Sequence, residues 1–188
     1  MKNQGCLILP LLLLACKVSA QTAAIDVRVY DYTGLQPSTL QKLVTQTQDI
    51  LAGTGASIQV KLCRGGSVPP CEAQTTARIL VLRIVPGEAK KMRNVRRLPL
   101  GQSFSDEDGG TYASVFLERV QDEAGSANVP WVTVLAFAAA HEVGHLLLGP
   151  SHTPSGLMKA AWDRNDYQAM NQKHLHFSEV QIRELRSR

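Results

Sequence analysis

Two histidines and a glutamate stand close together in the C-terminal half of the chain, as His141, Glu142 and His145. On an α-helix, side chains at positions i and i+4 lie on one face, so the two imidazoles can hold one metal ion together. Glu142 is adjacent on the helix and can reach a water molecule on that ion without being a ligand. This H-E-x-x-H pattern is typical of zinc hydrolases, in which the glutamate takes a proton from water.

A catalytic zinc site also needs a third protein ligand and one open coordination position. His152 is the first candidate, because Gly149 and Pro150 before it end the helix and turn the chain. The pair His174 and His176 has metal-like spacing, but such a pair more often marks a partly exposed segment. Four carboxylates further along the chain remain alternatives, namely Asp163, Asp166, Glu179 and Glu184.

The segment before the motif predicts the helix that would carry it. Residues 131–148 include a strongly apolar run, and Pro130 suits the first turn of a helix. Two histidines and a glutamate after such a run are costly to bury unless a metal ion and hydrogen bonds satisfy them. The apolar context therefore favours the zinc interpretation beyond a bare match to the motif.

The remaining pattern predicts an α/β domain of the α+β kind. Four segments have the alternating or continuous apolar residues of strands, 25–30, 57–62, 79–85 and 112–117. We expect the third strand to be covered on both faces and the fourth to lie near a sheet edge. Helical spacing predicts a helix over 39–51, the polar and glycine-rich stretch 104–110 predicts a loop, and Ser178 with Gln181 predicts a capping box for a last helix. The strand–helix–strand start indicates a mixed, largely parallel, twisted sheet of about four strands.

The stretch from His141 to Met158 resembles the metzincin metallopeptidases. Their signature is H-E-x-x-H-x-x-G-x-x-H, followed by a turn that places a methionine below the metal. The resemblance implies a minimal metzincin-like zincin domain with an active-site helix and a C-terminal helix. It implies that His141, His145 and His152 are the zinc ligands and that Glu142 is the general base.

The same resemblance assigns Met158 and the three residues before it to the methionine turn. Tyr167 is a candidate for stabilising the oxyanion, and a structural tyrosine is the alternative. The sequence also departs from the signature, because one extra residue separates His145 from Gly149, which adds about 100° of rotation and about 1.5 Å of rise on a helix. The family's tyrosine two residues after the methionine is Ala160 here. The chain therefore resembles a divergent metzincin.

Length and composition indicate one exported domain. The chain has 188 residues, of which 44% are hydrophobic, as is ordinary for a globular protein. Residues 1–20 predict a signal peptide, because Lys2 precedes an apolar run too short to span a bilayer and Ala20 ends a stretch of small residues suited to cleavage. The catalytic domain would then span 21–188, in a secreted or periplasmic protein. A bacterial lipobox ending at Cys16 is the alternative and would leave a lipoprotein anchored at that residue.

Charge and cysteine content agree with export. Removal of Lys2 and Lys17 with the leader lowers the formal net charge from +4 to +2, which is too weak to indicate nucleic-acid binding. We interpret the basic run 90–97 as a solvated loop for the same reason. Cys63 and Cys71 have the wrong spacing for a redox or metal pair and predict a disulfide in an oxidising compartment.

Together these features predict a secreted zinc-dependent peptidase, an endopeptidase with one catalytic Zn²⁺ and a peptide or protein substrate. We expect no nucleic-acid partner, no transmembrane segment after processing, and a monomer. The alternative from another class is a non-catalytic, zinc-stabilised module that binds peptides or proteins. The intact Glu142 and the open fourth position favour the enzyme.

Overall fold

A computed structural model describes the chain in residues 25–63, 71, 77–87 and 98–187. The expected signal peptide, Cys16 and the basic run 90–97 lie outside these residues. The described elements, in chain order, are β1 (Ile25–Asp31), α1 (Pro37–Ala52), β2 (Ile58–Cys63), β3 (Arg78–Val85), β4 (Gly101–Asp106), β5 (Gly109–Phe116), α2 (Leu117–Ala127), α3 (Trp131–Leu148), α4 (Arg164–Asn171) and α5 (Glu179–Ser187).

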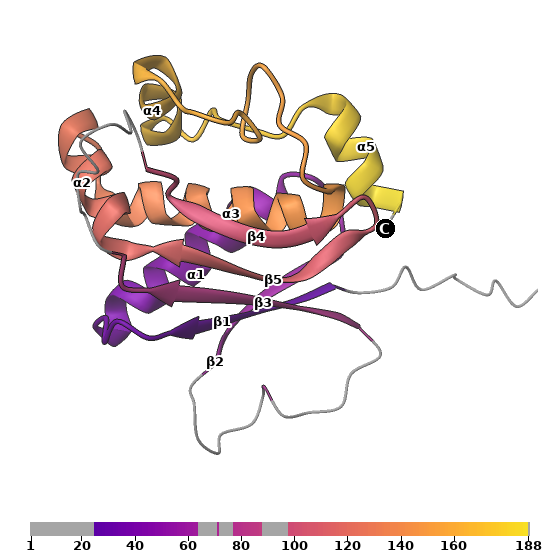
Figure 1. Cartoon of the computed structure of the whole chain (residues 1–188), viewed down its shortest axis with the longest axis horizontal. Coiled ribbons are helices and arrows are strands. Elements are labelled where there is room, and N and C mark those ends of the chain that lie inside the picture. Colours follow the sequence, from indigo (N-terminus) through magenta and orange to yellow (C-terminus); the bar gives the residue numbers. More distant parts are fainter. Residues whose placement is uncertain (1–24, 64–70, 72–76, 88–97, 188) are drawn as a thin grey trace, which may run out of the picture.

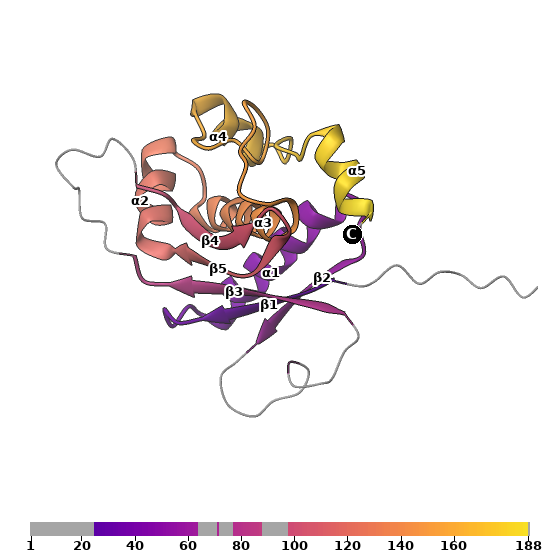
Figure 2. The same cartoon turned by 45° about the vertical axis from the view of Figure 1, so that its right-hand side comes forward.

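The strands form one sheet in the order β2-β1-β3-β5-β4. β1 runs parallel to β2 and to β3, β3 runs parallel to β5, and β4 pairs with β5 in antiparallel fashion. Helices α1 and α3 lie together on one face of this sheet, with α3 against β5 and β4 (Figures 1 and 2). This mixed, largely parallel sheet with its helices confirms the predicted fold class.

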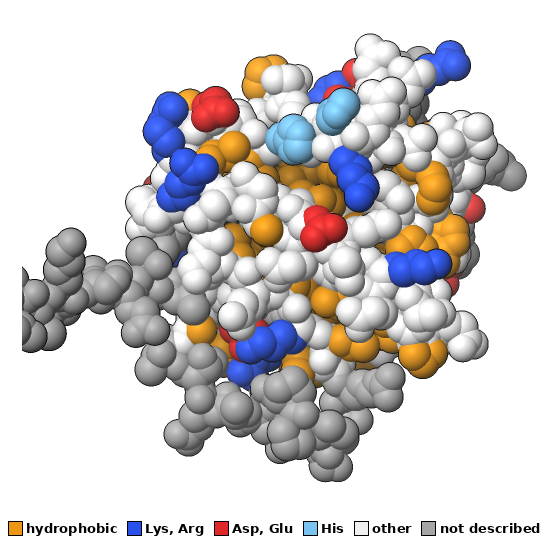
Figure 3. All heavy atoms as spheres, turned by 180° about the vertical axis from the view of Figure 1, so that it is seen from behind, with side chains coloured by type: hydrophobic (Ala, Val, Ile, Leu, Met, Phe, Trp, Pro, Cys, Tyr) orange, Lys and Arg blue, Asp and Glu red, His pale blue; other side chains and the backbone are white. Residues whose placement is uncertain are grey.

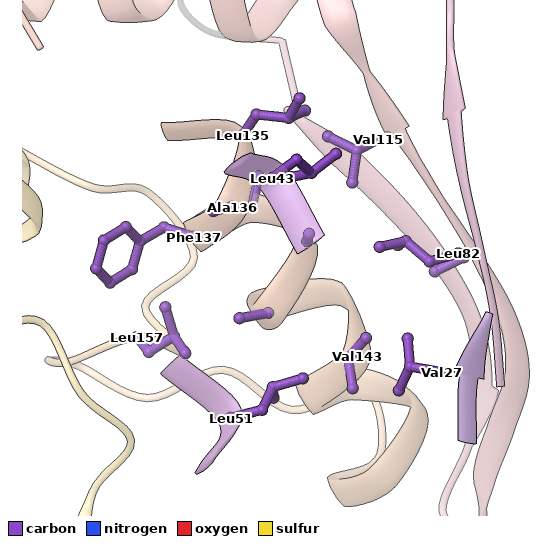
Figure 4. Close-up of a cluster of buried hydrophobic side chains, with 14 of the residues drawn as sticks. Val27, Leu43, Leu51, Leu82, Val115, Leu135, Ala136, Phe137, Val143 and Leu157 are labelled. Carbon is purple, nitrogen blue, oxygen red and sulfur yellow. The ribbon is translucent and has the colours of Figure 1, made fainter. Parts of the chain in front are cut away.

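The core lies between the sheet and helices α1 and α3. Figure 4 shows apolar side chains from these elements converging, among them Leu43 of α1, Val143 of α3 and Leu82 of β3. Every residue of α3 from Val134 to Leu147 is buried. This helix is also long and apolar enough to cross a membrane, but 78% of it is buried inside the protein, so we interpret it as a core helix. The predicted histidine motif therefore stands on the most buried helix of the fold.

The surface of the described residues is mixed in character. Figure 3 shows the molecule from behind, with Lys, Arg, Asp and Glu side chains scattered among polar and apolar ones. Some large apolar side chains are exposed as well, with Phe104 of β4 at 50% and Val180 of α5 at 63%. Phe104 stacks on Tyr112 of β5, with the ring centroids 4.6 Å apart.

The strand predictions need two corrections at the β4 edge. The predicted loop 104–110 is wrong, because Gly101–Asp106 forms the edge strand β4, so the described sheet has five strands and not about four. The predicted edge strand 112–117 is β5, which lies between β3 and β4. The sequence hides β4 because its inward residues are small and its outward residues are exposed, so no apolar alternation marks it.

The prediction that β3 is covered on both faces is also wrong. Leu80, Leu82 and Ile84 are wholly buried on the helix side of the sheet. On the other side Val81 is only half-buried, and Ile79 is 37% exposed. The nearly continuous apolar run thus belongs to a central strand whose second face is only partly covered.

The predicted helices over 39–51 and 131–148 are confirmed as α1 and α3. The predicted capping box before α5 is confirmed too, since the Ser178 N–H donates to Gln181 Oε1 at 2.9 Å and the Gln181 N–H donates to Ser178 Oγ at 3.4 Å. Helices α2 and α4 are additional to the prediction. Their short length gives only a few turns of periodicity, which is a weak signal in a sequence.

Cys63, the last residue of β2, and Cys71 form a disulfide, which confirms the predicted bridge. Both cysteines are buried, at 2% and 8% exposure. Cys63 ends β2, the strand at one edge of the sheet, whereas β4 forms the opposite edge.

Replacement of both cysteines by serine should lower the free energy of unfolding by about 2–3 kcal/mol, because the unfolded chain then regains the freedom of the closed loop. Denaturant titration of the wild type and of Cys63→Ser/Cys71→Ser measures the difference, with reduced wild type as the control. Equal stability of the oxidised wild type and the double variant would contradict this expectation.

Candidate functional site

Three histidines come together where α3 ends. His141 and His145 stand on successive turns of α3, and His152 comes from the loop that follows. The Nε2 atoms of His141 and His145 are 3.0 Å apart, and those of His145 and His152 are 3.1 Å apart. Nitrogen ligands about 2.0–2.1 Å from a tetrahedral zinc ion lie roughly 3.3 Å from one another, so the spacing suits that ion.

Backbone carbonyls fix the orientation of two of these rings. His141 Nδ1–H donates to the carbonyl of Leu157 at 2.8 Å, and His145 Nδ1–H donates to the carbonyl of Gly149 at 2.9 Å. A carbonyl only accepts, so the proton of each neutral ring is on Nδ1 and Nε2 carries a lone pair. The two Nε2 lone pairs therefore face each other at 3.0 Å, which is repulsive unless a cation lies between them.

A proton does not remove this repulsion at neutral pH, because the imidazoles are neutral there. Burial lowers the pKa of His141 from its ordinary value of 6.5 to about 4, although the hydrogen bond to Leu157 acts in the opposite direction. Burial likewise lowers the pKa of His145 and of His152. The donor set of three neutral imidazoles thus fits a metal ion.

A tight turn next to the cluster supports the first histidine. Leu157, whose carbonyl orients His141, also accepts a hydrogen bond from Trp162 Nε1 at 3.2 Å. Met158 is wholly buried, and its Sδ packs so closely on Gly144 of α3 that a Cβ at position 144 would collide with it. The segment predicted as the methionine turn thus packs Met158 against α3.

The carboxylates considered as third ligands are engaged elsewhere or lie outside the cluster. Asp163 and Asp166 form the capping box of α4, and Lys159 Nζ contacts both at 2.6 Å. Within residues 25–63, 71, 77–87 and 98–187, the close group of potential metal ligands consists of the three histidines. It does not include Glu179, Glu184, His174 or His176.

Glu142 lies buried between α3 and β4, with 6% of its surface exposed. Burial raises the pKa of its carboxyl group from 4.5 to about 7, and a hydrogen bond from Ser103 of β4 partly offsets that rise. A group that exchanges its proton near neutral pH suits general acid–base catalysis. Glu142, the predicted base, lines the same cavity as His141, His145 and His152.

A cavity of about 480 Å³ adjoins the histidines and Glu142. Its apolar walls come from residues 98–100, before β4, and 160–162, after the methionine turn. Tyr167 also lines it, but this tyrosine is buried and its hydroxyl donates to Glu123 of α2 at 3.1 Å. The volume is within the usual range for ligand pockets and would accommodate a side chain of a peptide.

Sequence reasoning missed three residues of this site: Gly101, Ser103 and Trp162. The first two lie on the strand that the sequence hides, and they reach Glu142 only through the pairing of β4 with β5. Trp162 packs its ring edge-to-face on His141, with the centroids 5.5 Å apart. A tryptophan four residues after the predicted methionine turn was the one available signal.

Comparisons with known proteins support the fold alone. No protein-family model matches the sequence, and no curated protein matches it. Among solved structures, the crystal structure of archaemetzincin from Methanopyrus kandleri is similar, with a TM-score of 0.58 and 16% sequence identity. The match covers 89% of this chain and 96% of that protein. At this identity the likeness shows the fold alone and does not test the motif.

In the metal-free protein, Glu142→Gln should increase stability at pH 8 and have little effect at pH 4. The raised pKa of Glu142 means that its contribution to stability is complete below about pH 4.5 and is lost as the pH rises through about 7. Glutamine does not ionise, so the variant gains up to about 3 kcal/mol over the wild type across this interval.

Thermal unfolding of both chelator-treated proteins at pH 4, 6 and 8 measures this gain. The histidines titrate in both proteins, so the difference isolates Glu142. A difference that stays the same at every pH would argue against a raised pKa.

Gly149→Ala should weaken zinc binding at least tenfold. Gly149 has φ +88° and ψ −176°, a conformation that costs other residues about 1–3 kcal/mol, and its carbonyl orients His145. Gly125→Ala on α2 is the matched control, since nothing lies within 4 Å of a Cβ there and alanine favours a helix. Competition with a chromophoric chelator gives the affinities. Wild-type affinity in Gly149→Ala would show that this loop conformation is dispensable.

Proposed function

We propose that this protein is an exported, metzincin-like zinc endopeptidase. The observation that carries the proposal is the pair of lone pairs on His141 and His145 Nε2, fixed toward each other at 3.0 Å by carbonyl acceptors on Nδ1. His152 adds a third neutral nitrogen. Three imidazole donors suit zinc, and a catalytic zinc site typically has three protein ligands and one open position.

The chemistry that zinc supplies when bound is a lower pKa for water and polarisation of the substrate carbonyl. Glu142 takes the proton of the attacking water and passes it to the leaving amine. His141 and His145 hold the ion with rings that the carbonyls of Leu157 and Gly149 keep from rotating. The apolar walls of the cavity exclude water beside the bond that is cleaved and contact the side chains of the peptide.

The metallopeptidase-like fold supports the same proposal. The name of archaemetzincin places that protein among the metzincins, and its structural match covers 89% of this chain. In the present chain the turn with Met158 packs against the active helix, as the metzincin resemblance implies. The fold, the turn and the histidine cluster thus each support the proposed class of enzyme.

Export is the second part of the proposal. The disulfide between Cys63 and Cys71 supports it, since such bonds persist in oxidising compartments. Cleavage after Ala20 would release a secreted or periplasmic protein, whereas processing at Cys16 would leave a lipid anchor. Mass spectrometry of the exported protein distinguishes the two through its N-terminus.

Replacement of the general base Glu142 distinguishes a peptidase from a zinc-stabilised binding module. The wild type should bind one zinc ion per chain and cleave a mixture of denatured proteins, and a chelator should abolish the cleavage. Glu142→Ala should keep the zinc and lose about 10²–10⁴-fold in activity, because only the proton transfer is removed. A zinc-loaded wild type that cleaves nothing would favour the binding module, and an active Glu142→Ala variant would exclude this mechanism.

The third ligand is tested separately with His152→Ala, which should reduce the zinc stoichiometry or weaken the affinity strongly. His174→Ala is the matched control, because His174 is exposed and outside the cluster. Zinc content after equilibrium dialysis gives the result. Unchanged zinc binding in His152→Ala would assign the third ligand to another residue.

A further inference from the structure

The edge strand β4 presents only small side chains to α3. Its inward residues are half-buried, whereas the alternate residues are exposed. The inward set consists of Gly101, Ser103 and Ser105. β4 and α3 are in contact along this face, so the sheet edge approaches the helix beside Glu142.

Gly101 leaves the space that the Glu142 side chain fills. A Cβ at position 101 would lie 2.5 Å from Oε1, 2.6 Å from Cγ and 2.7 Å from Cδ of Glu142. A Cβ atom does not approach a non-bonded heavy atom this closely. Any larger residue at position 101 therefore has to displace the Glu142 carboxyl group. The φ of Gly101 is outside the left-handed region, so the backbone itself does not require glycine here.

Ser103, two residues further along the same face, lines the same cavity as Gly101 and Glu142. Its hydroxyl acts on the Glu142 carboxyl group as a hydrogen-bonding group and lowers the pKa of that group. Ser105 follows at the next inward position, and its buried Oγ has no partner among the described residues. The two serines therefore lie on the same face of the same strand and have side chains of the same size. Of the two, only Ser103 acts on the Glu142 carboxyl group.

We propose that β4 positions the general base, with Gly101 providing the space for the Glu142 side chain and Ser103 orienting its carboxyl group. This inference rests on the proposed function, since Glu142 is a general base only if the protein is a peptidase. Gly101 and Ser103 are positioning residues, because both act through Glu142. Displacement of a catalytic group by about 1 Å can reduce a rate on the order of 10²-fold.

The kinetic test uses the zinc-loaded exported protein with unfolded casein as the substrate. Gly101→Ala should lower kcat about 100-fold and Ser103→Ala about 10-fold, with KM and zinc content unchanged. Ser103→Thr keeps the hydroxyl and should restore most of kcat. Ser126→Ala on α2 is the control and should keep the wild-type kcat, because Ser126 is exposed and does not line the cavity.

A second readout does not depend on activity. In the metal-free protein, Gly101→Ala should lower the melting temperature by about 3 °C, since the new methyl group and Glu142 compete for one space. In the Glu142→Ala background the same change should leave the melting temperature unaltered, because the three atoms nearest to the new Cβ are gone.

Wild-type kcat in both Gly101→Ala and Ser103→Ala would overturn the inference while leaving the proposed function intact. So would an equal loss of melting temperature with and without the Glu142 side chain, since Gly101 would then be needed for backbone packing alone. A Ser103→Thr variant as slow as Ser103→Ala would remove the role of the hydroxyl. A zinc-loaded wild type without hydrolytic activity would overturn the proposed function, and the positioning role with it.

Discussion

The site depends on a repulsion that the protein itself creates. The carbonyls of Leu157 and Gly149 accept the Nδ1–H groups of His141 and His145, and this choice of tautomer turns two Nε2 lone pairs toward each other at 3.0 Å. In a buried place without a cation, such an arrangement costs free energy. A metal ion between the rings converts the same geometry into two coordinate bonds, so the fold and the metal would stabilise one another. The folding of this corner of the molecule is therefore coupled to metal binding under the proposed function.

Burial on α3 explains why the pKa values of His141 and Glu142 are shifted from their ordinary values. The helix carries its histidines and Glu142 within a run that is buried from Val134 to Leu147, and the same burial lowers the pKa of His141 and raises that of Glu142. Neutral imidazoles are the form that binds metal, and a carboxyl group with a pKa near 7 is the form that transfers protons at neutral pH. Under the proposed function, the burial of the helix thus favours both metal binding and proton transfer. Burial of these ionisable groups lowers the stability of the metal-free protein. Other contacts of the core have to offset this loss.

The sequence predicted the elements whose signals are local and missed those whose formation depends on partners. Periodicity predicted α1, α3 and most strands of the sheet, and the spacing of His141 and His145 predicted that the two rings lie close together. The sequence did not predict the edge strand β4, because this strand has no alternating apolar pattern. It forms through its pairing with β5 and its packing on α3. Third-ligand candidates such as Asp163 stayed open for the same reason. Asp163 caps α4, and its spacing from the histidines along the sequence does not show this role.

The extra residue between His145 and Gly149 shows how the departure from the metzincin signature is absorbed. The helix continues through Leu148, and Gly149 then takes a conformation with φ +88° and an extended ψ, which other residues adopt only with strain. The chain turns back far enough for His152 Nε2 to lie 3.1 Å from His145 Nε2. The Gly149 carbonyl also accepts the Nδ1–H of His145, so the residue that turns the loop also orients one of the proposed ligands. Under the proposed function, the spacing of the signature is therefore one solution to a geometric requirement, which a longer helix with a suitably placed glycine also meets.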